Sequence, residues 1–217
     1  MKIASPFCSP HYARINKARL EHLESLKLPL EGKTVLELGA GIGDLTDFFV
    51  NQDCDVTCVD GRVPNVCAIQ ERHPWVKALL LDVEEDFGHL GQFDVVFAYG
   101  LLYHLERPFQ ALRRFACHTS GVFLLETKVL TDLEAPQNPL EDVKDRTQAL
   151  HGVGSLLPRQ AILATLSDLF QHVYIPTTQP EHEEFLVDWA NAKPPCREIF
   201  VASRSQLSSP NLIETLR

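Results

Sequence analysis

A chain of 217 residues with 45% hydrophobic and 23% charged residues has the length and composition of one soluble globular domain. Its 11 glycines and 14 prolines are far too few for a collagen-like or low-complexity chain, which excludes fibrous and disordered classes. The 20 basic and 29 acidic residues give a net charge of −9, so a protein that binds nucleic acid through a broad basic surface is disfavoured.

The cysteines and the first residues indicate a reduced, cytoplasmic protein. The six cysteines form no Cys-x-x-Cys pair, and Cys54 and Cys58 lie too far apart along a predicted strand to share a metal ion. We therefore expect free thiols and no metal. The N-terminal sequence lacks the apolar core of a secretory signal, and no window is apolar for long enough to span a membrane.

The first predicted element is an amphipathic helix between Pro10 and Lys27, where apolar residues recur at helical spacing among charged ones. Pro29 and Gly32 then mark a turn. We expect residues 1–30 to form an N-terminal cap ahead of the core.

Short apolar runs follow, each ending at a polar or glycine residue, and they cover residues 34–38, 54–59, 76–81 and 93–98. Helical patterns cover residues 44–50, 62–71 and 107–117. Apolar runs that are mostly separated by helical intervals predict parallel strands buried on both faces. A fifth strand is predicted at 121–125.

The C-terminal third begins with a segment, 128–157, that has prolines, glycines and charges but no sustained period, which predicts a lid-like insertion. A helix is predicted from Pro158 to Phe170, followed by strands at 172–175 and 198–202. The polar connection between these strands, 176–196, is too short for a convincing crossover helix, so we expect an antiparallel return with this loop on the substrate side. The tail, 206–217, is expected to be loosely attached.

In an open parallel sheet, ligands bind beyond the carboxyl ends of the strands. The first such end carries a glycine loop, Gly39-Ala40-Gly41-Ile42-Gly43, whose alternate glycines let a ligand approach the backbone. The dinucleotide fingerprint needs a further glycine at position 44, where this chain has Asp44, and a carboxylate there disfavours a pyrophosphate. Asp60 follows the loop by about 20 residues, where a carboxylate accepts both hydroxyls of a ribose. The pattern indicates a nucleoside without a diphosphate.

Four motifs occur at these strand ends: VLELGAGIG at 35–43, CVDG at 58–61, LLDVEED at 80–86 and FDVVFAYGLLYHLERP at 93–108. In this order they resemble the class I S-adenosylmethionine-dependent methyltransferases, and the likeness covers residues 34–127. It implies an α/β, Rossmann-like fold: a seven-stranded, mostly parallel sheet with an antiparallel last strand and helices on both faces, in one domain over residues 1–205. It also implies S-adenosyl-L-methionine as cofactor. We expect the methyl acceptor to be a small molecule or metabolite.

The resemblance assigns the cofactor to Glu37, Gly39, Ala40, Gly41, Asp60, Gly61, Arg62, Asp82, Val83 and Tyr99. It places the glycine loop under the methionine portion, with Glu37 ordering the loop. Asp60 would hold the ribose, and Asp82 would accept from the adenine amino group beside the Val83 amide. The Tyr99 carbonyl region would lie near the sulfonium.

Methyl transfer from a sulfonium is a direct displacement, so a general base is needed only when the acceptor must lose a proton. His104 is the candidate base, because it follows the fourth strand end and imidazole titrates near neutral pH; packing or substrate positioning is the alternative role. Tyr103, His151 and Trp189 are candidate substrate contacts, each with a packing or turn role as its alternative.

Three other functions compete with this interpretation. One is a non-catalytic partner protein that binds S-adenosylmethionine or S-adenosylhomocysteine, and another is an NAD-dependent oxidoreductase, which Asp44 disfavours. The Tyr-His turn before Pro108, with VFLLETKVL at 122–130, is also similar to the tRNA wobble-uridine carboxymethyltransferases, but the negative charge makes a nucleic-acid partner unlikely. Neither the methylated atom nor the oligomeric state follows from the sequence.

Overall fold

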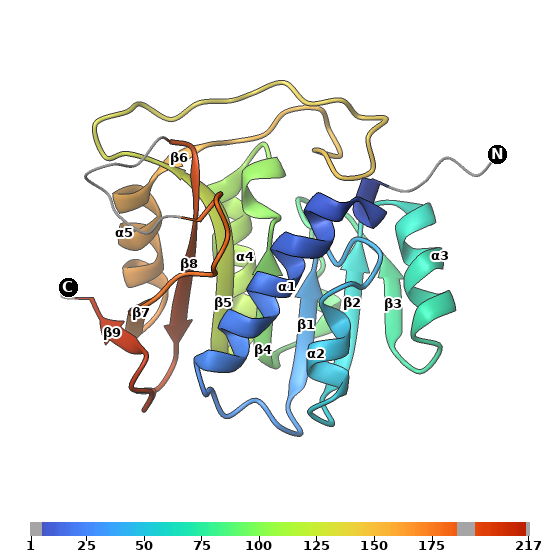
Figure 1. Cartoon of the computed structure of the whole chain (residues 1–217), viewed down its shortest axis with the longest axis horizontal. Helices are drawn as coiled ribbons and strands as arrows, with labels where there is room; N and C mark the ends of the chain where they lie inside the picture. Colours follow the sequence, from blue (N-terminus) through green and yellow to red (C-terminus); the bar gives the residue numbers. More distant parts are fainter. Residues whose placement is uncertain (1–5, 186–193, 216–217) are drawn as a thin grey trace.

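The computed structural model describes residues 6–185 and 194–215, and within them nine strands form one sheet in the order β3-β2-β1-β4-β5-β8-β7-β9, with β6 paired to β5 (Figure 1). The strands are β1 (Thr34–Leu38), β2 (Asp55–Asp60), β3 (Lys77–Leu80), β4 (Phe93–Tyr99), β5 (Thr119–Leu130), β6 (Leu157–Pro158), β7 (His172–Pro176), β8 (Cys196–Ser203) and β9 (Leu212–Glu214). The predicted Rossmann-like α/β fold is confirmed. The strand number is higher than the seven expected, because β6 and β9 are added at the C-terminal side.

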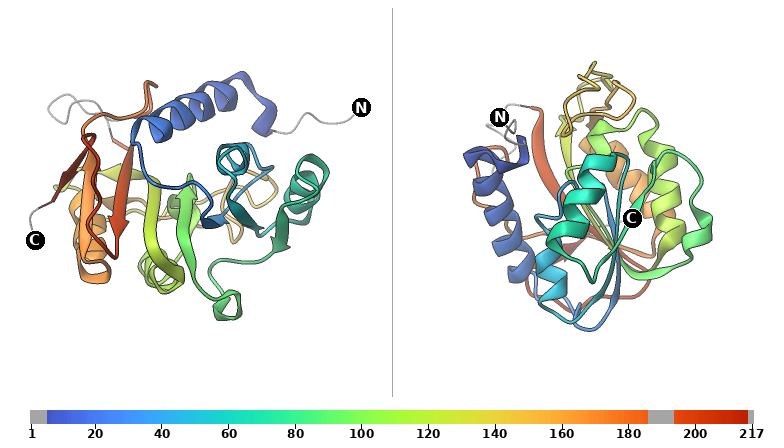
Figure 2. Two further views of the ribbon diagram at one scale, coloured as in Figure 1. Left: turned by 90° about the horizontal axis from the view of Figure 1, so that it is seen from below. Right: turned by 90° about the vertical axis from the view of Figure 1, so that its right-hand side faces the viewer.

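Helices cover both faces of this sheet. They are α1 (Pro10–Ser25), α2 (Thr46–Val50), α3 (Val63–Arg72), α4 (Pro108–His118) and α5 (Arg159–Leu169), with short 3-10 turns η1 (Pro6–Cys8), η2 (Gly88–Leu90) and η3 (Leu102–His104). The first three helices pack on one face and the last two on the other (Figure 2). None of the described helices is both long and apolar enough to cross a membrane.

The central strands are apolar throughout because each lies between two helical layers. Val35 of β1 and its parallel neighbour Val95 of β4 belong to the cluster under α1, whereas Leu36 and Val96 face α4 and α5. Adjacent residues of one strand therefore pack into hydrophobic clusters on opposite faces of the sheet, which explains the uninterrupted apolar runs of the sequence.

The strand order reverses at β1, which pairs in parallel with β2 on one side and with β4 on the other. The chain passes from β1 to β2 on one side and later returns to β4 on the other side. This reversal of strand order opens a crevice beyond the carboxyl ends of the strands. The antiparallel return is also confirmed, since β8 runs antiparallel to both β5 and β7.

The insertion, residues 131–156, crosses above the carboxyl ends of the strands (Figure 1). Backbone hydrogen bonds between Gln137 and Leu156 join its two ends. The guanidinium of Arg62 donates to the carbonyls of Val143, Gln148 and Ala149, so the far part of the insertion is held to the end of β2.

The C-terminal segment is attached to the sheet, contrary to our expectation. Strand β9 pairs with β7, and its Ile213 lies opposite Ile175. The Ser209 hydroxyl donates to the Leu26 carbonyl and the Asn211 amide donates to the Ser25 carbonyl, which ties the segment to the end of α1. The sequence did not predict this strand because β9 has only three residues and polar residues precede it.

Candidate active site

A pocket lies in the crevice at the carboxyl ends of β1, β2 and β4. It is lined by most of the predicted site residues: Gly39, Ala40, Gly41, Asp60, Gly61, Arg62, Asp82, Val83, Tyr99, Tyr103 and His104. Glu37 lies behind the glycine loop, His151 contacts Asp82 from the insertion, and Trp189 falls outside the described residues.

The floor of the pocket requires glycine. Gly39 and Gly41 have φ angles of +66° and +59°, which side-chain-bearing residues rarely adopt. A Cβ on Gly41 would lie 2.9 Å from the Phe7 ring, and one on Gly39 would lie 2.7 Å from the Leu101 side chain. The absence of side chains at these two positions therefore lets Phe7 and Leu101 lie directly against the backbone of the loop.

Asp60 joins this loop to the end of β2. Its carboxylate accepts from the Gly41 N–H at 3.0 Å, the Arg62 N–H at 2.9 Å and the Asn65 side-chain amide at 3.1 Å. Burial raises the pKa of Asp60, and these hydrogen bonds partly oppose that effect. A carboxylate offers about four acceptor positions, so one remains for a ligand.

Glu37 fastens the loop from the opposite side. It is fully buried, and its carboxylate accepts from the Thr46 hydroxyl at 2.7 Å and from the Cys58 thiol at 3.4 Å. Burial raises the pKa of Glu37 to about 7. The residue connects β1 to α2 and does not line the pocket, so its position fits the loop-ordering role that the resemblance implies.

The insertion closes the pocket at Asp82. One oxygen of this carboxylate accepts from the Glu84 N–H at 2.9 Å, and the other lies 2.7 Å from Nε2 of His151. Leu150 covers Gly61, where an added Cβ would lie 2.7 Å from the leucine methyl. His151, a predicted substrate contact, thus lies beside Asp82, which the resemblance assigns to adenine.

Two polar atoms without hydrogen-bond partners among the described residues mark the opposite end. They are the Tyr99 hydroxyl and Nε of Arg19, both buried on residues that line the pocket. Burial raises the pKa of the Tyr99 hydroxyl, so it is neutral and able to donate. Arg14 lies on the same helix as Arg19, but its guanidinium is exposed and lies 3.6 Å from the Glu183 carboxylate.

These features fit S-adenosyl-L-methionine. Asp60 suits the ribose, the apolar side chains of Leu81 and Val83 suit the adenine, and Tyr99 with Arg19 offers donors for an amino-acid carboxylate. Nothing in this set resembles a diphosphate cradle, because the Asp44 carboxylate lines the glycine-loop end of the pocket.

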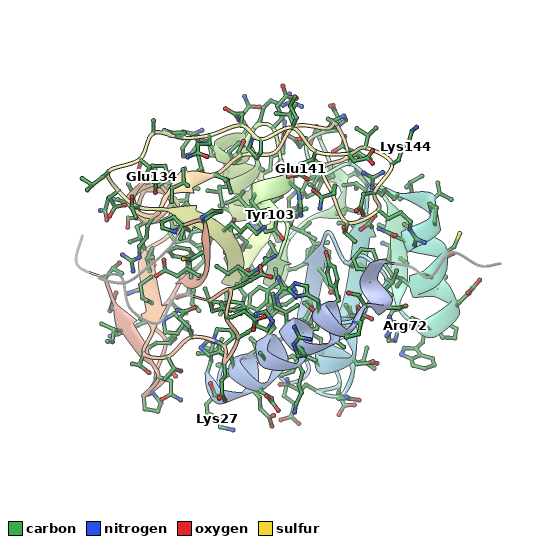
Figure 3. All side chains as sticks on the ribbon, turned by 45° about the horizontal axis from the view of Figure 1, so that its top comes forward. Lys27, Arg72, Tyr103, Glu134, Glu141 and Lys144 are labelled. Carbon is green, nitrogen blue, oxygen red and sulfur yellow. The ribbon has the colours of Figure 1, made fainter. Side chains whose placement is uncertain are left out.

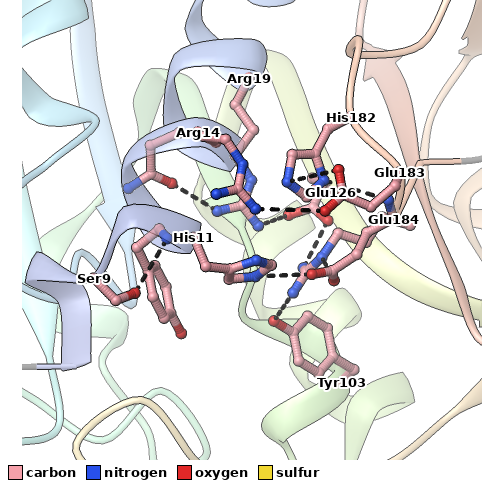
Figure 4. Close-up of polar contacts among 12 residues, drawn as sticks. Ser9, His11, Arg14, Arg19, Tyr103, Glu126, His182, Glu183 and Glu184 are labelled. Carbon is pink, nitrogen blue, oxygen red and sulfur yellow. Dashed lines mark hydrogen bonds and ion pairs between the residues drawn. The ribbon is translucent and has the colours of Figure 1, made fainter.

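A buried ion-pair network forms the wall beyond Tyr99 (Figure 4). Glu126 of β5 lies between Arg19 of α1 at 2.5 Å and Arg197 of β8 at 2.9 Å. Burial acts to raise the pKa of Glu126, but the two guanidiniums outweigh it and the pKa is lowered. Arg197 also donates to the Tyr103 hydroxyl at 2.9 Å and to Glu184 at 2.8 Å. Tyr103 is thereby fixed in the pocket wall.

His104 has a carboxylate partner that the sequence did not reveal. Its Nδ1 lies 2.6 Å from Glu141 of the insertion, and Figure 3 shows Glu141 near Tyr103 above the sheet. Sequence reasoning also missed Glu126 and Arg197. The three residues lie far apart in the chain, and no spacing or motif connects them.

His11, His182 and Glu183 bring potential metal-ligand atoms within 4.8 Å of one another beside the network. Protein groups contact most of this cluster, but Nε2 of His182 is buried without a hydrogen-bond partner among the described residues. His11 lies 2.8 Å from Glu184, and His182 Nδ1 accepts from the Glu184 N–H at 3.3 Å. Arg14 balances Glu183.

The comparisons agree with this geometry. Residues 36–120 match a family model described as a methyltransferase domain. No curated protein matches the chain. The N-terminal domain of EvdMO1, crystallised with S-adenosylhomocysteine and D-fucose, is 24% identical with a TM-score of 0.66, over 90% of this chain and 84% of that one.

Two further solved structures share the fold. An S-adenosylmethionine-dependent methyltransferase from Mesorhizobium loti is 16% identical with a TM-score of 0.61, over 86% of this chain and 98% of that one. The 1,6-didemethyltoxoflavin-N1-methyltransferase of Burkholderia thailandensis is 16% identical with a TM-score of 0.54, over 94% of both chains. The matched segment, the strand order and the pocket together support a class I S-adenosylmethionine-dependent methyltransferase.

Proposed function

We propose that this protein transfers the methyl group of S-adenosyl-L-methionine to a small-molecule acceptor by direct displacement. The observation that carries the proposal is the single pocket that joins the glycine loop, Asp60 and Asp82 to the Tyr103-His104 turn. The cofactor brings an already activated methyl group. The protein then has to hold the acceptor in line, at about 3 to 3.5 Å from the methyl carbon, and exclude water.

Individual residues take the following parts. Asp60 holds the ribose and Asp82 the adenine, while Tyr99 and Arg19 meet the amino-acid end. Tyr103 contacts the acceptor, and His104 receives the proton that a hydroxyl acceptor loses.

A small acceptor is supported by charge and by structural neighbours. The net charge of −9 is unsuited to a polyphosphate substrate. One structural neighbour was crystallised in the presence of D-fucose, and another with bound 1,6-didemethyltoxoflavin. We further propose a cytoplasmic location, which the cysteines support because none of the six forms a disulfide bond in the part of the chain that the structure describes.

Two measurements test the function. Calorimetry with S-adenosylhomocysteine and with NAD should show binding of the first alone. The protein is then incubated with methyl-labelled cofactor and, in separate reactions, a protein-free small-molecule extract or bulk tRNA, and only the small-molecule extract should yield labelled product. Binding without any transfer would favour the non-catalytic partner protein, and transfer only to tRNA would favour the carboxymethyltransferase-like alternative.

A further inference from the structure

His104 and Glu141 form a closely held pair at the acceptor end of the pocket. His104 ends η3 directly after β4, and its side chain is 14% exposed. The Glu141 side chain, from the insertion, is 9% exposed and places Oε2 at 2.6 Å from His104 Nδ1. The Tyr103 ring packs against the imidazole with centroids 4.1 Å apart, so the imidazole is fixed from two sides.

The charge of Glu141 determines which imidazole nitrogen carries the proton. Burial acts to raise the pKa of Glu141, but the hydrogen bond and charge of His104 and the Ala149 N–H outweigh it, and the pKa is lowered. An ionised carboxylate only accepts hydrogen bonds, so Nδ1 must be the donor. Nε2 of a neutral His104 then has a free lone pair, and His104 lines the pocket.

We propose that Glu141 is a positioning residue that makes His104 a general base, and that the acceptor is a hydroxyl compound methylated on oxygen. This inference rests on the proposed function and specifies its acceptor class. A neutral amine or thioether is nucleophilic enough to attack the methyl carbon without a base, whereas a hydroxyl oxygen is a weak nucleophile until its proton is removed.

The proposed methyl transfer forms one bond to carbon and breaks another. The hydroxyl oxygen forms a bond to the methyl carbon while its proton passes to Nε2 of His104. The carbon–sulfur bond breaks and its electron pair stays on sulfur. The products are a methyl ether, S-adenosylhomocysteine and imidazolium, which the Glu141 carboxylate stabilises until the proton reaches solvent.

The base is complete only while the insertion is docked. The Glu141 carboxylate also accepts from the Ala149 N–H at 2.5 Å, and the Glu141 N–H donates to the Gly152 carbonyl at 2.9 Å. A Cβ on Gly154 would lie 2.5 Å from Glu141, which shows how closely the insertion packs around this carboxylate. Arg62 holds the same insertion over the cofactor end of the pocket. Docking of the insertion therefore covers the cofactor and brings Glu141 to His104 at the same time.

The other charged groups around the pair are few. Asp145 of the insertion interacts electrostatically with His104, and Lys128 of β5 interacts with Glu141. Lys128 also lies over the Tyr103 ring, 5.0 Å from its centroid. Among residues 6–185 and 194–215, only Glu141 is in hydrogen-bond contact with the imidazole, so its removal should dominate any change in the pH–rate profile.

The first test reads the imidazole directly in the cofactor-free protein. Nitrogen-15 NMR of the histidine rings should show neutral His104 with its proton on Nδ1. Glu141→Ala should shift the population toward the Nε2–H form, whereas Glu134→Ala, elsewhere in the same insertion, should leave it unchanged. A wild-type His104 that carries its proton on Nε2 would overturn the proposal.

The second test identifies the methylated atom. The protein is incubated with cofactor labelled with carbon-13 in its methyl group and with a protein-free small-molecule extract, and NMR distinguishes methyl bound to oxygen, nitrogen or sulfur. An O-methyl product supports the inference, and an N- or S-methyl product overturns it. If S-adenosylhomocysteine binds but no product forms, the proposed function itself fails, and the inference falls with it.

Glu141→Gln separates positioning from folding. It should lower the turnover of the O-methylation by at least about tenfold, as expected for an impaired general base. The acidic limb of its pH–rate profile should move to lower pH, because a neighbouring negative charge is removed. Affinity for S-adenosylhomocysteine should stay within twofold. An unchanged pH profile would overturn the positioning role.

Discussion

Glu37 gives the protein a pH-dependent stability that a single substitution should remove. The carboxyl is protonated in both the unfolded and the folded chain below its ordinary pKa of 4.5, whereas in the folded chain burial raises that pKa to about 7. The stabilising effect of the proton is therefore complete below pH 4.5 and is lost as the pH rises through 7. A pKa change of one corresponds to about 1.4 kcal/mol, so the total loss is about 3 kcal/mol.

The substitution Glu37→Gln keeps an acceptor for the Thr46 hydroxyl and removes the titration. We expect the free energy of unfolding of the variant, relative to wild type, to rise by about 3 kcal/mol between pH 4.5 and pH 8. Urea denaturation at a series of pH values measures it. Glu198, whose pKa burial also raises to about 7, titrates in both proteins and cancels in the difference.

The matched control is Glu71→Gln on the exposed side of α3, where the difference from wild type should not change with pH. A Glu37→Gln difference that is equally flat would refute the reasoning, since it would mean that the buried carboxyl is not held neutral by its surroundings.

Three other substitutions probe the pocket and its walls. Asp60→Ala should weaken S-adenosylhomocysteine binding by about 1 to 3 kcal/mol in calorimetry, whereas Asp55→Ala at the exposed start of the same strand should not; equal affinities would remove Asp60 from the ribose site. Glu126→Ala leaves Arg19 buried without its counter-charge and leaves Arg197 with Glu184 alone, so it should lower the free energy of unfolding by about 3 to 5 kcal/mol, measured with urea; a change below 1 kcal/mol would contradict the network. Arg62→Ala removes the contacts that hold the insertion and should speed proteolytic cleavage within 131–156. Arg113→Ala on the exposed side of α4 is the control, and equal cleavage rates in the two variants would argue against a docked insertion.

Sequence patterns predicted the central sheet well because its strands are buried on both faces. The run over Thr34–Leu38 has only one local interpretation, and the structure has the same strand. The fifth strand was predicted to end at Leu125 and extends to Leu130 instead. Its extension carries Glu126 and Lys128, which have no apolar pattern and enter the sheet because residues distant in sequence neutralise Glu126.

The pocket was predictable where a residue acts at its own strand end, as Asp60 does. It was not predictable where two segments meet. Glu141 reaches His104 across 37 residues of sequence, from a loop without periodicity, and only the fold determines that contact. For the same reason the contact of His151 with Asp82 was not foreseen, because the path of an irregular insertion cannot be derived from local preferences.

The pairing of β9 with β7 has a consequence for any shortened form of this protein. Without the residues after 205, one side of β7 would present unsatisfied N–H and C=O groups along Tyr174–Pro176, a template onto which a strand from another molecule can add. A truncated protein would thus tend to self-associate through its flank, even with its catalytic half intact.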